Sequence, residues 1–423
     1  MMRISLLLVC IFFFFGGCTD RKSKTKEDVL QEEEVIKRDT VIHLVEALDA
    51  QPTAFYISEI ADSITYLPLE TGANCLLSRT IILRFAQDGI YPGRCLKFGW
   101  DGKFVKQIGR VGQGRGEDPN AFAWLLKSKD LYYTVGNRII EYDTDGEFTG
   151  KETNKFFLKS REDSTIIYNL FREVESAVID GHILIYQYPD SLIWVDTKDF
   201  KVDHTARVVE QGDIKVDGIS FYLTQCFFIS YNEKKIFYNF YNDTIYTVRG
   251  DGLSPEWVVD LGNRKLPNEV TLYKLGPLSR QALRGGSIEA SELITKTDGK
   301  IFINNIYESD RFLLFYYSET RYFWETRKKD PPVGRLIIYD KVTKSLTNIK
   351  DKIIDDLNGG PGLRPFYDGV IDNKLIAMIW PFELKEYVNE HRNEGKLSSK
   401  LIDIADHLDN EDNPVLIIVH LKK

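Results

Sequence analysis

The sequence contains few residues of the kinds that build metal and redox sites: 5 Cys, 6 His and 3 Met among 423 residues. It contains no CxxC pair and no HExxH or GxSxG motif, so the usual zinc and serine-hydrolase signatures are missing. Basic residues are in the minority, with 55 Lys and Arg against 63 Asp and Glu and a net charge of −8. Nucleic-acid-binding proteins normally present a basic face. We therefore predict no metal, no cofactor and no nucleic-acid partner.

An apolar run near the N-terminus, from Ile4 to Phe15, follows the basic residue Arg3. A helix of this length spans about 18 Å, well short of the roughly 30 Å core of a bilayer. The run therefore predicts a signal peptide over residues 1–17 rather than a membrane span. The residues Gly16-Gly17-Cys18 resemble a bacterial lipobox, in which the Cys thiol is lipidated and becomes the mature N-terminus.

Residues 18–39 are predicted to be a flexible tether to this lipid anchor. From Arg21 to Asp39 the chain has few apolar residues and blocks of like charge, RKSKTKEDVLQEEEVIKRD. Two or more acyl chains attach a protein stably to a membrane, which is thus a predicted partner. Asp20 is followed by basic rather than acidic residues. This favours a periplasm-facing anchor in the cell envelope, with the outer surface as the alternative.

Three cysteines remain after the lipidated one: Cys75, Cys95 and Cys226. Their scattered positions allow at most one disulfide and do not form a disulfide framework. We expect buried free thiols.

Residues 40–423 have the pattern of an all-β domain. Short apolar runs with period-two character are broken by turn residues, as at 63–69, 180–186 and 335–339. The composition agrees, with 22 Tyr, 25 Phe and 30 Gly.

A second regularity predicts how these strands are grouped. Tight turns centred on 101, 145, 198 and 251 are 44, 53 and 53 residues apart, and another follows near 342. This is close to the period of a β-propeller blade. Each turn is interpreted as the hairpin between the two outer strands of a four-stranded blade, with Asp-Gly supplying the positive φ that two-residue hairpins need.

The remaining residues complete a six-bladed ring with two helical insertions. The alternation is lost at 263–295 and again at 382–409, where Leu397, Leu401, Ile404, Ala405 and Leu408 have the spacing of an amphipathic helix. The chain ends on an apolar strand, 413–421. We predict that an N-terminal strand, 63–69 or 41–45, completes the last blade and closes the ring.

Several segments resemble the six-bladed β-propeller lipoproteins of gut-type Gram-negative bacteria, which are related in architecture to NHL-repeat propellers. They are Tyr66–Glu70, Asp101–Val105 leading into Ile108–Glu117, Phe240–Tyr246, Asp355–Pro361 and Asn413–Leu416. The resemblance covers nearly all of the mature chain. These motifs are turns and strand ends, so the resemblance implies a fold and no catalytic residues.

Two loops carry the candidate ligand-binding residues. Gly109–Glu117 lacks the spacing of a phosphate-binding loop and is interpreted as a blade-to-blade connection, on which Arg110, Arg115 and Glu117 are expected to line one face of the ring. Asp355 and Asp356 precede Gly359-Gly360 in a loop that we expect near the central channel.

The sequence leaves three functions open. No catalytic constellation is visible, because the six His are dispersed and carboxylate pairs are expected by chance among 63 acids. The favoured hypothesis is a binding or interaction module for a glycan, peptide or partner protein, since a propeller presents many loops on one face. The alternatives are a sugar-processing hydrolase or lyase with its site at the central channel, and a structural component of an envelope complex.

Overall fold

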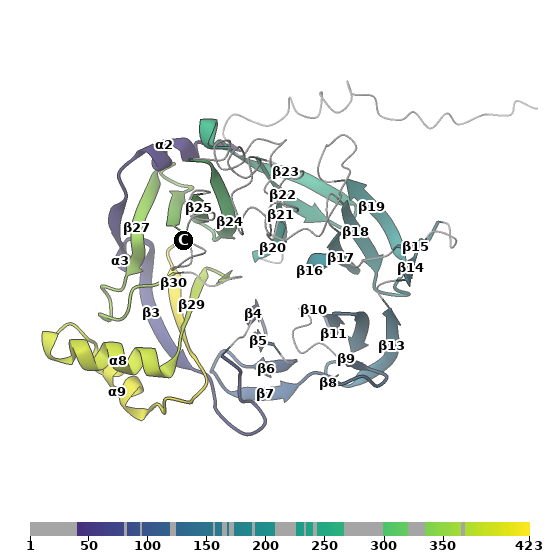
Figure 1. Cartoon of the computed structure of the whole chain (residues 1–423), viewed down its shortest axis with the longest axis horizontal. Coiled ribbons are helices and arrows are strands. Elements are labelled where there is room, and N and C mark those ends of the chain that lie inside the picture. Colours follow the sequence, from purple (N-terminus) through teal and green to yellow (C-terminus); the bar gives the residue numbers. More distant parts are fainter. Residues whose placement is uncertain are drawn as a thin grey trace, which may run out of the picture. The chain divides into compact units, whose positions relative to one another are not determined.

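The computed structural model describes most of the chain from Thr40 onward (Figure 1). The described residues are 40–79, 83–93, 95–118, 124–154, 157–162, 167–168, 173–187, 191–207, 226–231, 234–239, 243–265, 299–319, 335–364 and 369–423. The predicted signal peptide, Cys18 and the predicted tether lie outside them, as does nearly all of the helical insertion predicted at 263–295.

Six sheets, here called blades 1 to 6, are arranged around a common centre, each with four antiparallel strands (Figure 1). The six-bladed β-propeller is confirmed. Blade 1 consists of β4 (Leu83–Ala86), β5 (Gly89–Pro92), β6 (Leu96–Phe98) and β7 (Phe104–Gln107). Blade 2 consists of β10 (Trp124–Ser128), β11 (Leu131–Val135), β12 (Arg138–Tyr142) and β13 (Phe148–Asn154). Blade 3 consists of β16 (Glu173–Ile179), β17 (His182–Gln187), β18 (Ser191–Asp196) and β19 (Val202–Arg207).

The N-terminal segment adds a fifth strand to blades 4 and 5 and supplies the fourth strand of blade 6. Blade 4 consists of β20 (Cys226–Tyr231), β21 (Lys234–Asn239), β22 (Thr244–Arg249), β23 (Gly252–Val259) and β1 (Val41–Ile42). Blade 5 consists of β24 (Ile301–Glu308), β25 (Phe312–Glu319), β26 (Arg335–Asp340), β27 (Leu346–Ile354) and β2 (Thr53–Tyr56). Blade 6 consists of β28 (Val370–Ile371), β29 (Lys374–Ile379), β30 (Val415–Leu421) and β3 (Ala61–Pro68).

The period-two patterning builds the contacts between blades. Along β30, Val415, Ile417 and Val419 pack into the cluster shared with blade 5, whereas Leu416 and Ile418 pack into the cluster shared with blade 1. The buried apolar side chains of the described residues form six such clusters, one between each pair of neighbouring blades. Both faces of a blade are therefore apolar, and stability comes from stacking blades around the ring.

The five predicted turns do join the two outer strands of blades 1 to 5. Most are longer than the two-residue loops expected from sequence. In blade 2 the backbone of Asp143 pairs with Glu147, and Gly146 takes φ 87° at the end of a three-residue loop. The Asp143 carboxylate accepts hydrogen bonds from the backbone N–H groups of Asp145 and Glu147, which fixes this loop.

The N-terminal segment closes the ring and also covers two strand edges. β3 pairs antiparallel with β30, so the chain's two ends complete blade 6, as predicted for the 63–69 strand. The other candidate segment is used differently. β1 pairs in parallel with β23 of blade 4, and β2 pairs in parallel with β27 of blade 5. Both additions satisfy backbone groups at otherwise open sheet edges.

Two helices occupy the predicted insertion in blade 6, α8 (Pro381–His391) and α9 (Ser399–His407). Ser398 caps α9 by accepting a hydrogen bond from the Leu401 N–H at 3.2 Å. α9 is shorter than the sequence pattern, with Leu397 before it and Leu408 after it, yet all these apolar side chains pack with the cluster between blades 5 and 6. The remaining short elements are α2 (Leu44–Asp49), α3 (Ile57–Ile60), β8 (Arg110–Val111), β9 (Glu117–Asp118), β14 (Leu158–Lys159), β15 (Ile167–Tyr168), η3 (Gly262–Arg264) and η5 (Arg392–Glu394).

A test of the closure is the substitution Asn413→Ala. Asn413 is buried just before β30, where its side chain accepts from the Leu77 N–H at 2.8 Å and donates to the carbonyls of Glu70 at 2.6 Å and Cys75 at 2.8 Å. Removing the amide leaves three buried backbone groups without these partners, so we expect a loss of about 2–4 kcal/mol in the free energy of unfolding, measured by urea denaturation.

The matched control is Asn393→Ala, at an exposed position of η5. It should change stability by less than about 0.5 kcal/mol. Equal stability of the two variants would show that Asn413 does not hold the closure.

Candidate functional site

The antiparallel order of each blade defines two ends of the ring. Turns between the first and second strands, counted from the centre, lie at one end, here called the inner-turn end. Turns between the third and fourth strands lie at that same end, whereas connections from one blade to the next lie at the opposite end. Side chains on inner turns of different blades therefore converge near the ring axis.

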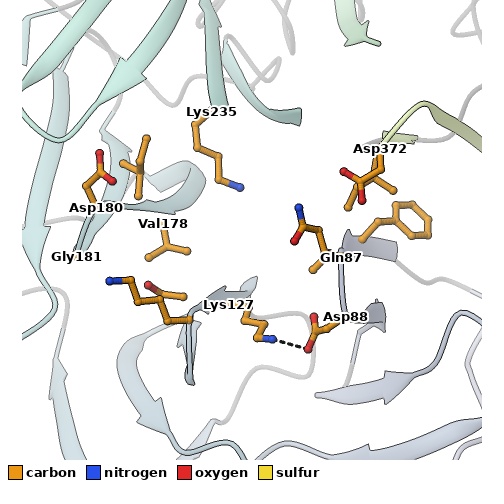
Figure 2. Close-up of a pocket in the computed structure, with 14 residues that line it drawn as sticks. Gln87, Asp88, Lys127, Val178, Asp180, Gly181, Lys235 and Asp372 are labelled. Atoms are coloured by element: carbon orange, nitrogen blue, oxygen red, sulfur yellow. Dashed lines mark hydrogen bonds and ion pairs between the residues drawn. The ribbon is translucent and has the colours of Figure 1, made fainter. Parts of the chain in front are cut away.

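A cavity of about 530 Å³ opens at the inner-turn end (Figure 2). Its volume lies within the range of small-ligand sites in proteins. Five of the six blades contribute to it. The lining residues are Phe85, Ala86, Gln87 and Asp88 of blade 1, Lys127, Ser128 and Lys129 of blade 2, Val178, Ile179, Asp180 and Gly181 of blade 3, Lys235 of blade 4, and Ile371 and Asp372 of blade 6.

Tight hairpins hold three of these charged residues. The turns pair Ser128 with Leu131, Ile179 with His182 and Ile371 with Lys374, leaving two residues in each loop. Lys129, Asp180 and Asp372 adopt φ values of 48°, 45° and 46°. This region is uncommon for residues other than glycine, and such strain is concentrated at functional sites. These three charged residues are therefore held on short, rigid loops.

Asp88 is the centre of an ion-pair network at one side of the cavity. Its carboxylate accepts a hydrogen bond from Lys127 at 2.5 Å (Figure 2). It also accepts from Lys97 at 2.6 Å and from the Tyr91 hydroxyl at 2.7 Å. Burial by itself raises the pKa of Asp88, but the hydrogen bonds from Lys127, Lys97 and Tyr91 outweigh it and lower the pKa to about 2. Two lysines for one carboxylate leave this side of the cavity with a net positive charge.

Lys235 enters the cavity from blade 4, near the start of β21. In the view of Figure 2 its ammonium points into the cavity, with Asp180 and Asp372 on opposite sides of it. Burial lowers the pKa of Lys235, and the positive charge of Arg84 on β4 lowers it further, to about 8. Both effects disfavour the charged form of this lysine.

Arg110, Arg115 and Glu117 lie on the connection from blade 1 to blade 2, at the end of the ring opposite the cavity. Arg110 pairs with Glu117 in the short β8–β9 ladder. Arg115 is exposed, donates to the Gly150 carbonyl at 3.0 Å and lies over the Phe148 ring. The Glu117 carboxylate accepts from the Gly114 N–H at 2.9 Å.

This glycine-rich connection is a loop, as the sequence indicated. Gly109 and Gly116 have φ values of 65° and 71°, and a Cβ at either position would come within 2.4 Å of the ring of Tyr142 or Phe148. The glycines are thus required by close packing against blade 2.

Asp355 and Asp356 lie on the connection from blade 5 to blade 6, also away from the cavity. Asp355 is 3% exposed, and its carboxylate accepts from the Tyr66 hydroxyl at 2.7 Å and from the N–H groups of Leu357, Asn358 and Gly360 at 3.1, 2.8 and 3.1 Å. Asp356 accepts from the N–H and hydroxyl of Ser58 at 3.0 and 2.5 Å. Both carboxylates fix the loop to the N-terminal segment. The structure does not bring them together with Asp88, Lys235 or the other cavity residues.

A histidine pair that the linear sequence did not reveal lies in blade 3. The Asp203 carboxylate is 3.3 Å from His182 Nε2 and 3.4 Å from His204 Nδ1, and 3.0 Å from Arg161 Nε. His204 stacks on Trp194 at a centroid distance of 4.4 Å. His182, Asp203 and His204 meet because β17 and β19 flank β18 in the same sheet.

Two of the remaining cysteines are buried free thiols, as expected. They are Cys75 and Cys95, and burial together with the charge of Asp118 raises the pKa of Cys95 to about 12. The Cys226 side chain lies outside the description. Across the described residues no cluster of three or more His, Cys, Asp or Glu side chains is placed to hold a metal ion. In the same part of the chain no helix is long and apolar enough to cross a membrane.

The inner turns that line the cavity have a sequence pattern of their own. Polar pairs separate apolar strands at Gln87-Asp88, Lys129-Asp130, Asp180-Gly181 and Asp372-Asn373. These pairs form the inner turns of blades 1, 2, 3 and 6. Once a propeller is predicted, this second series marks the residues nearest the axis.

Fold and site together define a six-bladed β-propeller with a charged cavity at one end of its ring. The chain belongs to the family described as a domain of unknown function, DUF4934, whose profile matches residues 39–420. No curated protein matches the sequence.

One solved structure to which the chain is similar is a Bacteroides fragilis NCTC 9343 protein described as exported. It is 19% identical, covers 91% of this chain and 99% of its own, and has a TM-score of 0.59. BamB from Moraxella catarrhalis is 10% identical over 64% of this chain and 66% of its own, with a TM-score of 0.29. The RRP9 WD40 repeats are 12% identical over 85% and 100%, with a TM-score of 0.37. At 19% identity the Bacteroides structure supports the fold alone.

The Asp88 network predicts a pH-dependent contribution to stability. A carboxylate whose folded pKa lies below its ordinary value stabilises the fold above that ordinary value, and this contribution disappears as the pH falls toward the folded pKa. Asp88→Asn should therefore cost about 2 kcal/mol of unfolding free energy at pH 7, and the difference from the parent should shrink between pH 4 and pH 2. Urea denaturation at several pH values measures both.

Asp130→Asn is the matched control, because Asp130 is an exposed carboxylate on the inner turn of blade 2. This substitution should leave the free energy of unfolding nearly unchanged at every pH. An Asp88→Asn cost that stays the same from pH 7 to pH 2 would contradict the ion-pair explanation.

Proposed function

We propose that this protein is an exported, lipid-anchored binding module whose ligand occupies the cavity at the inner-turn end. The observation that carries the proposal is the convergence of charged side chains from five blades on one cavity of about 530 Å³. Rigid hairpins place these charges before any ligand arrives, which reduces the ordering cost of binding. The ligand is a glycan, a peptide or an exposed part of a partner protein that is small enough to enter.

The location rests on the N-terminal sequence. An apolar run too short to span a bilayer precedes Gly16-Gly17-Cys18, and a charged tether follows. The likeness to a Bacteroides fragilis protein described as exported agrees with this assignment. We place the propeller in the cell envelope, facing the periplasm, as a lipoprotein of a gut-type Gram-negative bacterium.

The second candidate function is a sugar-processing hydrolase or lyase with its site in the same cavity. The favouring observation is Lys235, because a lysine with a pKa near 8 inside a cavity can accept a proton near neutral pH. Binding is preferred because Asp88 is engaged with two lysines and a tyrosine, which ties it to a structural role. Release of product from a bound glycan would favour the enzyme.

A steric block tests the proposed site. Ser128 lines the cavity on the inner turn of blade 2, so Ser128→Trp should fill the entrance and reduce affinity for any ligand of this site at least tenfold. The assay is a binding screen of glycans and peptides on the full chain in detergent, with turnover measured in parallel.

Ser345→Trp is the control, since Ser345 is exposed on the outer turn of blade 5 at the same end of the ring. This variant should bind ligands of the cavity with the same affinity as the parent protein. Ligands whose affinity is the same in both variants would place the binding surface elsewhere.

Cys18→Ala tests the anchor. Without the thiol no acyl chain can be attached, so the protein should appear in the soluble fraction instead of the membrane fraction. The comparison is Cys10→Ala, within the predicted signal peptide, which should remain anchored. A Cys18→Ala protein that is processed normally and stays in the membrane would refute the lipid assignment.

A further inference from the structure

One side of the cavity is aromatic. Phe85 of β4 lines the cavity, and Trp100 stacks on it with a centroid distance of 6.1 Å and an angle of 25° between the ring planes. Trp100 lies outside the lining of the cavity, so it supports the Phe85 ring from behind. Offset stacking of this kind stabilises the two rings relative to each other. Phe85 is therefore held in place before any ligand arrives.

Trp100 is itself fixed to the inner turns of two blades. Its indole N–H donates to the carbonyls of Ala86 and Gln87, at the inner turn of blade 1, at 3.1 Å each. The ammonium of Lys374, which follows the inner turn of blade 6, lies 4.7 Å from the centroid of the Trp100 ring. Phe85 and Trp100, here called the aromatic wall, are thus anchored to the same turns that form the cavity.

Polar side chains that are free to bind a ligand face the same cavity. In the described part of the chain no hydrogen bond or ion pair engages the side chains of five lining residues, which are Gln87, Ser128, Lys129, Asp180 and Asp372. Asp180 and Asp372 lie on opposite sides of the cavity in Figure 2. The amide, hydroxyl, ammonium and carboxylate groups of this set include both donors and acceptors of hydrogen bonds.

The charges that line the cavity are of both signs. Asp180 and Asp372 face it together with Lys127 and Lys129. An ionic ligand of either sign would therefore meet repulsion as well as attraction. A neutral molecule with hydroxyl groups can donate to the carboxylates and accept from the amide and ammonium groups. The lining thus favours a neutral ligand that is rich in hydroxyls.

We infer that the cavity binds a neutral sugar, with one face of the sugar ring packed on Phe85 and its hydroxyls hydrogen-bonded to Asp180 and Asp372. A pyranose has C–H groups on its faces and hydroxyls around its edge, which matches an aromatic wall next to polar groups. A cavity of about 530 Å³ accommodates a mono- or disaccharide. This inference rests on the proposed function and selects the glycan from the ligands considered there.

Calorimetric titration into the full chain in detergent tests the ligand class. The probes are four neutral disaccharides (cellobiose, lactose, mannobiose and xylobiose), sorbitol, glucuronate and the peptide trialanine. We expect at least one disaccharide to bind saturably and about tenfold more tightly than sorbitol, which has hydroxyls but no ring face. Glucuronate or trialanine binding more tightly than every disaccharide, sorbitol binding as tightly as the best disaccharide, or no binding by any disaccharide overturns the inference.

Phe85→Ala tests the aromatic wall. It should weaken binding of the preferred disaccharide about tenfold, and Phe85→Leu should weaken it nearly as much because leucine has no flat face, whereas Phe85→Tyr should keep the affinity to within about threefold. Phe104→Ala is the matched control, because Phe104 packs against the same apolar cluster as Phe85 and does not line the cavity. Thermal unfolding of all four variants checks that the fold is retained. Equal losses of affinity in Phe85→Ala and Phe104→Ala, or full affinity in Phe85→Leu, contradict the role of Phe85.

The carboxylates are tested by Asp180→Asn and Asp372→Asn. Asparagine tolerates the left-handed backbone of both positions, with φ values of 45° and 46°, but it replaces a charged acceptor by a weaker neutral one. Each substitution should weaken binding of the disaccharide about fivefold. Asp130→Asn is the matched control, because Asp130 is exposed on an inner turn and does not line the cavity. Parental affinity in both Asp180→Asn and Asp372→Asn shows that these carboxylates do not hold the sugar.

The steric variant separates this inference from the function on which it rests. If trialanine binds, no disaccharide does and Ser128→Trp abolishes the binding, the cavity is a binding site and the sugar specificity is wrong. If a disaccharide binds equally well to the parent, to Ser128→Trp and to Phe85→Ala, the cavity is not its site and both proposals fall.

Discussion

The antiparallel pairing of β3 with β30 is the interaction on which the ring depends. It joins residues 61–68 to residues 415–421, so the two ends of the propeller are hydrogen-bonded to each other through one sheet. Without it blade 6 would lose its outer strand, and the cluster between blades 5 and 6 would lose Ile60, Ala61 and Tyr66. Because each blade is held by its two neighbours, opening one joint exposes apolar surface on both sides of the gap.

The position of the charged cavity follows from the same constraint. Closure fixes how many blades surround the axis, and the inter-blade clusters fix how each blade is oriented toward it. The inner turns are then short loops on rigid sheets, and their polar residues have no freedom to move away from one another. Charges from residues as distant in sequence as Asp88 and Asp372 thus face a single volume. Substitutions in these turns change the lining of the cavity with little effect on the packed sheets.

Much of the architecture was predictable because propeller blades are local units. The outer turns at 101, 145, 198, 251 and 342 and the apolar alternation report contacts within one blade, which a linear pattern contains. The candidate site was not predictable in this way. Arg110, Arg115 and Glu117 lie on one connection and Asp355 and Asp356 on another, whereas the cavity lies at the other end of the ring. Charged, glycine-rich loops drew attention in the sequence, but in the structure those glycines serve close packing.

From the sequence alone came the all-β class, the six-bladed ring, two candidate strands for its closure and the prediction of a lipid anchor at Cys18, since each depends on short-range patterns of apolar, turn and signal residues. Only the tertiary structure decided which of the 63 acidic and 55 basic residues meet. It placed Lys235 near Arg84, committed Asp88 to two lysines and turned Asp355 into a buried hydrogen-bond acceptor. The reason is physical: the energy of a charge depends on its burial and on neighbours that come from distant blades, and neither quantity is contained in local sequence.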